Sequence, residues 1–390
     1  MLKRLSSLCL VVFCFAFTTV EAIAEPKPPF AVQAREAYLL DLSTGAVLFE
    51  KNADVRMPPA SMSKLMTVYM VFEALANGEI AMDTRFNVSE KAWRMQGSKM
   101  FVGLGDDITV EDLLRGVIVQ SGNDACVVLA EGLAGSEEFF AEMMTDRAQA
   151  IGLTGSTFSN ATGWPDEGQM MTAADLGRLS ALLIREFPEY YHMFAEESFT
   201  YGVSLDGKPI TQPNRNPVLG RIDGADGLKT GHTEAAGYGL TASAERDDRR
   251  LILVVNGLDS KKQRSLSAER FLQWGFRNFT TVEVLKAGQV VDEAPVWLGE
   301  NATVPLVATE DLTLTLTRRD NRKIKAEIKY TAPIPAEIVK GTPLARLVLT
   351  GPDMGEKSVT LVAGSDVEKV GPLGKIGSAL EFLLLGQSGN

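Results

Sequence analysis

The chain has 390 residues, of which 45% are hydrophobic, and it carries a formal net charge of −11 at pH 7. A chain of this length buries a sizeable core and corresponds to two or three domains. An acidic surface disfavours nucleic acid as a partner. Because only two histidines are present, a His-rich metal site is excluded, and we expect no metal and no cofactor.

Residues 1–24 have the layout of a secretory signal peptide. A positively charged start is followed by an apolar run over residues 5–20 and by Ala-Ile-Ala at residues 22–24, a small-x-small cleavage site. The apolar run is short for a membrane span, so we expect cleavage rather than a retained anchor. Two of the three cysteines leave with this segment, and the remaining Cys126 forms no intramolecular disulfide framework.

Residues 25–279 predict an α+β domain, because helical patterns lie between an N-terminal hairpin and a later run of strands. Apolar periodicity and capping residues define most of its elements. In chain order they are a hairpin over residues 38–51, an apolar central helix over residues 61–79, helices after Thr109, Asn123 and Thr172, strands after Gly224, and an amphipathic helix over residues 265–279.

Residues 280–370 change character to short β-type runs separated by Gly and Pro, which predicts a small all-β domain. Residues 371–390 predict a short amphipathic helix with Leu373 and Ile376 on its apolar face. Such a helix can lie in a lipid interface, so residues 373–385 are a candidate for peripheral membrane contact. The alternative is that this helix packs on its own β-domain, since few cations are present to meet anionic lipid.

Three short motifs occur in order along the chain: Ser61-x-x-Lys64, Ser121-x-Asn123 and Lys229-Thr230-Gly231. Each motif arises often by chance. The ordered set of three is typical of serine enzymes that react with penicillin.

The first motif predicts a serine nucleophile with a lysine base. Ser61 and Lys64 are three residues apart at a predicted helix start, so their side chains share one face. A serine hydroxyl is a poor nucleophile until a base takes its proton, and no histidine lies beside this motif. Lys64 can be that base if burial and a nearby cation such as Lys229 lower its pKa. Without the other two motifs, Ser61 and Lys64 would be interpreted as an N-cap serine and a solvated helix lysine.

The other two motifs predict the walls of the same site. A turn at Ser121-Gly122-Asn123 would display both polar side chains, although Ser, Gly and Asn are also ordinary turn residues. A strand that contains Gly231 at a sheet edge suits a peptide substrate lying alongside it.

With PPASMSKLMT, SGNDA, DGLKTGHT and the WGF of residues 274–276, the chain resembles the low-molecular-mass penicillin-binding proteins, specifically the serine-type D-alanyl-D-alanine carboxypeptidases. The resemblance implies a penicillin-binding/β-lactamase-like transpeptidase domain followed by the β-domain. It also implies a periplasmic hydrolase of cell-wall biogenesis. Such an enzyme removes the terminal D-alanine from peptidoglycan stem pentapeptides through an acyl-enzyme, and β-lactams inhibit it covalently.

The resemblance further assigns roles to particular residues. It implies an oxyanion hole from the backbone N–H groups of Ser61 and His232. It implies proton relay and substrate positioning by Ser121 and Asn123.

A substrate that ends in a free carboxylate must be held by cations. Lys229 and Thr230 are suited to this by their motif, and the resemblance adds Arg264 and Arg215, because arginine pairs with carboxylates in a bidentate manner. The alternative for each arginine is an ordinary surface residue. We interpret Glu167, in the loop over residues 163–172, as a loop acid rather than a deacylating base.

Three other functions share the motif set: a D,D-endopeptidase, a class A β-lactamase, and a catalytically silent wall-binding scaffold. The predicted β-domain after Phe279 argues against a β-lactamase, which does not need such a domain. It also argues against a small endopeptidase, which usually lacks one. The intact motif residues argue against the silent scaffold. We also interpret Cys126 as a buried structural thiol.

Overall fold

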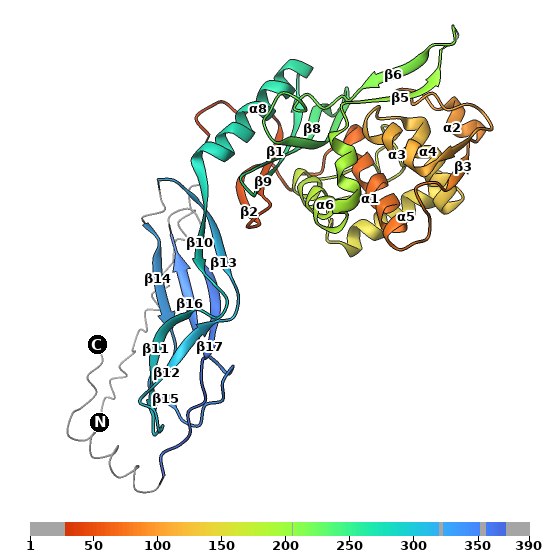
Figure 1. The fold of residues 1–390 in the computed structure, drawn as a ribbon. Helices are drawn as coiled ribbons and strands as arrows, with labels where there is room; N and C mark the ends of the chain where they lie inside the picture. Colours follow the sequence, from red (N-terminus) through yellow and green to blue (C-terminus); the bar gives the residue numbers. More distant parts are fainter. Residues whose placement is uncertain (1–27, 205, 320–322, 352–355, 372–390) are drawn as a thin grey trace, which may run out of the picture.

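The structure is a computed structural model that describes residues 28–204, 206–319, 323–351 and 356–371. The predicted signal peptide and the predicted helix over residues 371–390, apart from Gly371, lie outside the described residues. The remainder forms a globular part of helices and strands and an elongated part made of strands (Figure 1). The α+β and all-β predictions are therefore confirmed for the two parts.

A five-stranded antiparallel sheet organises the globular part, in the order β2-β1-β9-β8-β7. The first hairpin pairs with a strand that lies about 200 residues later in the chain. β1 pairs with β9 from Glu36↔Asn256 to Asp41↔Leu251. β7 lies at the edge of the sheet. The strands are β1 (Glu36–Asp41), β2 (Ala46–Lys51), β7 (Ala225–Thr233), β8 (Gly237–Arg246) and β9 (Arg249–Leu258).

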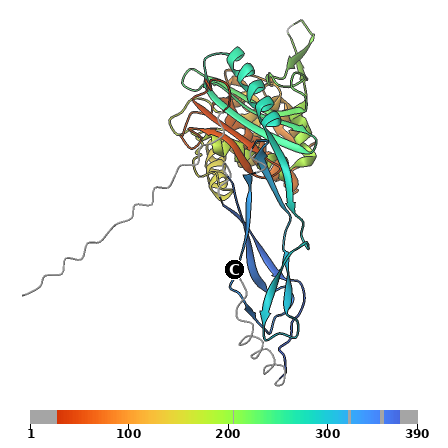
Figure 2. The same ribbon diagram turned by 90° about the vertical axis from the view of Figure 1, so that its left-hand side faces the viewer.

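Helices cover both faces of this sheet (Figures 1 and 2). One face packs against α8 (Lys261–Asn278) through a core that includes Leu39, Leu253 and Phe271. The larger core on the other face surrounds α1 (Lys64–Ala76), which is buried on nearly every side as its apolar sequence predicts. Within the residues that the structure describes, we find no helix that is both long enough and apolar enough to cross a membrane.

The remaining helices begin largely where the sequence predicts. Thr109 and Thr172 each accept a hydrogen bond from the backbone N–H three residues on, which confirms both caps. These helices are η1 (Ala60–Ser63), α2 (Glu90–Arg94), α3 (Val110–Ile118), α4 (Asn123–Ala134), α5 (Glu137–Ala150), α6 (Ala173–Glu186), α7 (Pro188–Tyr191) and η2 (His192–Ala195).

Several elements of the globular part were not predicted. One is α5, whose hydrophobic residues are interrupted by charges. Another is a hairpin of β5 (Ser198–Val203) and β6 (Pro209–Pro213) that projects away from the sheet (Figure 1). The short helix α2 and a pair of short strands before α3, β3 (Arg85–Asn87) and β4 (Asp107–Thr109), were also not predicted.

The elongated part has its own apolar core, which includes Leu306, Leu347 and Leu361. It contains a two-stranded sheet of β10 and β13 and a six-stranded sheet in the order β14-β16-β17-β12-β11-β15. Its strands are β10 (Phe279–Leu285), β11 (Val290–Trp297), β12 (Thr303–Ala308), β13 (Leu312–Thr317), β14 (Lys325–Lys329), β15 (Ile334–Pro335), β16 (Pro343–Thr350) and β17 (Lys357–Ala363).

A buried ion pair joins the two parts where α8 runs into β10. Arg249 Nε donates to Asp41 Oδ2 at 2.7 Å, and its Nη1 donates to the carbonyls of Gly275 at 3.2 Å and Phe279 at 3.0 Å. Thr315 of β13 donates to the same Asp41 oxygen at 2.9 Å. One carboxylate thus connects the sheet, through Arg249, to the end of α8 and to both strands of the small sheet.

Arg249→Met should lower the free energy of unfolding by about 3 kcal/mol or more, because the fully buried Asp41 carboxylate would lose its cation. The matched control is Arg94→Met, whose ion pair with Glu90 is 69% and 64% exposed and should contribute less than about 1 kcal/mol. Urea denaturation of the two variants and the parent measures both changes. Equal losses would contradict a special contribution from the junction.

Candidate active site

Ser61 lies in the 3-10 turn η1, directly before α1. The α-helix itself begins at Lys64, so the predicted helix start is three residues early, but the predicted pairing of the two side chains is confirmed. Lys64 Nζ donates to Ser61 Oγ at 3.0 Å. Ala60, the residue before the serine, has a φ of +49°, a conformation that non-glycine residues rarely adopt.

Lys64 is completely buried and has an oxygen partner for each of its three ammonium hydrogens. Besides Ser61 it donates to Asn123 Oδ1 at 2.7 Å and to the carbonyl oxygen of Thr162. An amide oxygen and a backbone carbonyl accept hydrogen bonds but cannot donate them. When Lys64 loses a proton, its nitrogen lone pair can therefore accept a hydrogen bond only from the hydroxyl of Ser61. The surroundings orient Lys64 as a base toward that one atom.

The environment also favours the neutral amine. Burial, together with a smaller contribution from the positive charge of Arg215, lowers the pKa of Lys64 from 10.5 to about 8. A base with a pKa near 8 is partly unprotonated at neutral pH, which general base catalysis requires.

Lys229 of β7 lies on the opposite wall of the site and is also buried. Its Nζ donates to Ser121 Oγ at 2.8 Å and to the carbonyl of Thr230 at 3.3 Å. Burial, followed by the charge of Lys64, lowers the pKa of Lys229 well below its usual range. Ser121 has a φ of +61°, so the turn before α4 holds it in a left-handed conformation. All three predicted motifs meet at one place.

Two glycines allow the walls to close on η1. A Cβ on Gly231 would lie 2.8 Å from the carbonyl oxygen of Pro59, so a larger residue would push β7 away from the nucleophile. A Cβ on Gly163, whose φ is +78°, would lie 2.0 Å from the carbonyl oxygen of Ala60. The strand and the loop after Thr162 therefore approach the serine turn as closely as a backbone can.

A segment before α3 carries a further part of the site that the sequence did not reveal. Asp124 holds residues 100–102 by accepting their backbone N–H groups at 2.8, 2.9 and 3.3 Å. Asn123 donates its backbone N–H to Ser98 O at 2.7 Å, and the Ser98 hydroxyl accepts a hydrogen bond from Arg215. This chain of contacts brings Arg215 near both lysines, whose pKa values it lowers.

Arg264 is not the surface residue that was its alternative interpretation, because only 6% of it is exposed. Its guanidinium lies 5.8 Å from the ring centroid of Tyr238, and its Nε is buried with no hydrogen-bond partner among the described residues. Burial lowers its pKa to about 10, and its charge contributes to the low pKa of Lys229. The imidazole of His232 stacks on the same Tyr238 ring at 3.9 Å.

Other candidate groups are inert in this arrangement. Cys126 is fully buried in α4 and burial raises the pKa of its thiol to about 12, which confirms that it is a buried thiol. In the described part of the chain, no group of three or more His, Cys, Asp or Glu side chains is arranged to hold a metal ion.

Residues 21–260 match the family described as D-alanyl-D-alanine carboxypeptidase, and residues 279–369 match the C-terminal domain of penicillin-binding protein 5. The chain belongs to the D-alanyl-D-alanine carboxypeptidase family. It is 37% identical over 386 residues to D-alanyl-D-alanine carboxypeptidase DacC of Escherichia coli, covering 96% of this chain and 94% of that one.

Solved structures of family members agree with the fold of this carboxypeptidase. Penicillin-binding protein 5 of Haemophilus influenzae superposes with a TM-score of 0.77 at 36% identity, covering 88% of this chain and all of that one. Penicillin-binding protein D2 of Listeria monocytogenes in its ampicillin-bound form has a TM-score of 0.57 at 31% identity. The match covers 64% of this chain and all of the Listeria protein.

Gly163→Ala should slow covalent acylation by ampicillin at least about tenfold, because the new methyl group would displace the turn that carries Ser61. Gly152→Ala is the control: Gly152 has a similar φ of +84°, but nothing lies within 4 Å of its Cβ position. It should destabilise the protein by about 1 kcal/mol without slowing acylation. Mass spectrometry of the acyl-enzyme over time measures both rates, and equal slowing would contradict the steric argument.

The rate of acylation should rise with pH and level off above about 8, because protonated Lys64 cannot accept the proton of Ser61. Arg215→Met should move the midpoint of this profile to higher pH, since the positive charge that lowers the pKa of Lys64 is removed. The measurement is the second-order acylation rate between pH 6 and 10. An unchanged midpoint would contradict the contribution of Arg215.

Proposed function

We propose that this chain removes the terminal D-alanine from peptidoglycan stem pentapeptides through an acyl-enzyme on Ser61. The observation that carries the proposal is the arrangement around Lys64, in which Ser61 is the one partner that can return a proton. The family match and the relatives named as D-alanyl-D-alanine carboxypeptidases support the same reaction. No cofactor takes part in the reaction that we propose.

In the first step Lys64 takes the proton of Ser61 while Oγ attacks the carbonyl of the penultimate D-alanine. The backbone N–H groups of Ser61 and His232 would stabilise the oxyanion that forms. The proton then passes to the nitrogen of the departing D-alanine. Ser121, which accepts a hydrogen bond from Lys229, is suited to relay it, and Asn123 orients the substrate while it holds Lys64.

In the second step a water molecule attacks the acyl-enzyme, and Lys64 takes a proton from the water. Ser61 then leaves with a proton returned by the amine, which restores the starting state. A β-lactam would enter by the same first step, and its acyl-enzyme would hydrolyse slowly. The ampicillin-bound relative from Listeria supports this interpretation.

Recognition of the free carboxylate of the substrate falls to a group of cations around β7. Lys229 and Thr230 provide the strand side, and Arg215 and Arg264 add positive charge near Lys229. A formal charge in a partly desolvated site needs such partners, and arginine is suited to a bidentate contact. Gly231 contributes by letting the strand approach the serine turn.

We further propose that residues 25–279 form the catalytic domain and residues 280–370 an accessory β-domain, with residues 1–24 a signal peptide that directs export to the periplasm. Residues 373–385 remain a candidate for peripheral contact with the membrane. Both assignments at the chain ends rest on the sequence pattern alone.

Ser61→Ala should abolish D-alanine release and penicillin labelling while leaving the unfolding transition intact, because Ser61 alone among the described hydroxyls receives a hydrogen bond from Lys64. Mass spectrometry after penicillin exposure, with mapping of the acylated residue, measures the label. Label that persists on Ser63 would contradict the assignment.

The behaviour of the parent enzyme separates the alternative functions. Rapid turnover of penicillin by the parent enzyme would indicate a β-lactamase. Penicillin label on the parent enzyme without D-alanine release would indicate an endopeptidase or a silent scaffold.

A further inference from the structure

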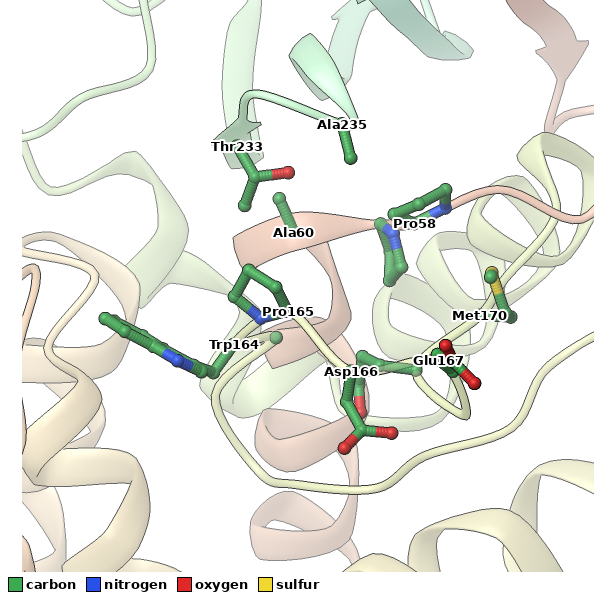
Figure 3. A pocket seen from close by; sticks show the side chains of 12 residues that line it. Pro58, Ala60, Trp164, Pro165, Asp166, Glu167, Met170, Thr233 and Ala235 are labelled. Carbon is green, nitrogen blue, oxygen red and sulfur yellow. The ribbon is translucent and has the colours of Figure 1, made fainter.

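Two cavities of the molecule differ in what surrounds them. One, of about 370 Å³, opens beside the serine turn, where Ala60 and Trp164 form part of its wall, and it belongs to the active site (Figure 3). The other, of about 520 Å³, lies at the junction where α8 runs into β10 (Figure 1). This junction cavity shares no lining residue with the active site, so the reaction steps above give it no function.

The wall of the junction cavity is rich in arginine. Four of its nine lining residues are arginines, against the single carboxylate of Asp247, in a chain whose net charge is −11. The fold gathers these four from β8, from β9, from α8 and from the residue after β13. They are Arg246, Arg249, Arg277 and Arg318. Such an excess of guanidinium groups in a cavity favours an anionic ligand.

Part of this charge has a structural role at the end of α8. Arg249 donates to the carbonyls of Gly275 and Phe279, and Arg318 Nε donates to the carbonyl of Arg277 at 2.9 Å. Cations near the carboxyl end of a helix also offset its dipole. These contacts explain why arginines collect here, but they use only some of the five N–H groups that each guanidinium carries.

Other N–H groups of these arginines lack partners. Arg249 is only 9% exposed, and its Nη2 is buried with no hydrogen-bond partner among the described residues. In the same part of the chain neither Arg277 nor Arg318 forms an ion pair with a carboxylate, and both are exposed. Arg246 Nε lies 3.6 Å from the carboxylate of Asp223, which is 90% exposed and therefore offsets its charge weakly. The junction cavity thus combines positive charge with available donors.

The charge balance indicates the class of anion. Asp41 offsets Arg249, and Asp247 offsets one of the other three arginines, which leaves about two positive charges in the wall. A phosphate monoester carries about 1.5 to 2 negative charges at pH 7 and offers three strong acceptor oxygens. A carboxylate has only one charge and two oxygens. Because the volume exceeds that of a phosphate group, room remains for the organic part of the ligand.

We propose that the junction cavity binds a phosphate monoester through Arg277 and Arg318, with Arg246 and Arg249 adding positive charge. These groups belong to both parts of the molecule, so the bound phosphate joins the globular part to the β-domain. It stabilises the junction in addition to the ion pair of Arg249 with Asp41. A soluble metabolite and a lipid headgroup can both carry this group. The inference is independent of the carboxypeptidase reaction.

Glycerol phosphate, a soluble phosphate monoester, tests the site on the full chain, with glycerol as the control. It should raise the midpoint of thermal unfolding, because a ligand that binds only the folded state stabilises that state. Titration calorimetry should show that the affinity falls below about pH 6, where the phosphate loses its second negative charge.

Arg277→Gln should weaken the binding of glycerol phosphate about five- to tenfold, and Arg277→Glu should abolish it, because each removes a charged donor. Arg270→Gln is the matched control. It removes the same charge from an exposed position on α8 that lies about two turns away and outside the cavity, so the parent affinity should be kept. D-alanine release without phosphate should be equal in the parent and all three variants, which shows that each is folded.

Vesicles of phosphatidylcholine, with and without phosphatidic acid, distinguish the source of the phosphate. Flotation that requires phosphatidic acid and is lost in Arg277→Gln would support the site and assign it to a lipid headgroup. Binding of glycerol phosphate without such flotation would support the site and assign it to a soluble ligand. Binding of neither, or binding that Arg277→Gln and Arg277→Glu leave unchanged, would overturn the proposal and leave the arginines as caps of α8.

Discussion

The burial of one amine among three oxygen atoms is the constraint on which the site depends. Lys64 reaches its position because α1 runs through the larger core of the globular part, where water cannot solvate a charge. Each acceptor comes from a different segment: the serine turn, the start of α4 and the loop that contains Thr162. Displacing any one of them would leave a buried donor without a partner, at a cost of about 1–3 kcal/mol.

The second lysine makes this constraint more severe. The charge of Lys64 lowers the pKa of Lys229, and the charge of Arg215 lowers the pKa of both buried lysines. The residues Ala60 and Ser121 hold left-handed backbone conformations next to the same two lysines. Strain and depressed pKa values at one place are typical of a catalytic site, and the surrounding core must stabilise them.

The β-domain is connected to the central sheet at the end of β1. Asp41 ends β1 of the central sheet, and its carboxylate accepts hydrogen bonds from Arg249 and from Thr315 of β13. Because Arg249 also binds the carbonyls at the end of α8, the helix cannot shift without disturbing the sheet. The junction thus orients the β-domain relative to the globular part through buried polar contacts rather than through apolar burial alone.

The sequence by itself determined most of the elements and the three motifs, because apolar periodicity, capping residues and motif spacing are local properties. It therefore predicted the first hairpin, the buried helix after Ser61, the caps at Thr109 and Thr172 and the all-β region. Only the tertiary structure decided which groups surround Lys64. The carbonyl of Thr162 could belong to any residue type, and Arg215 reaches the site through Ser98, more than 100 residues away in the chain. The cavity beside Ala60 likewise joins segments far apart in sequence, so no local pattern could reveal it.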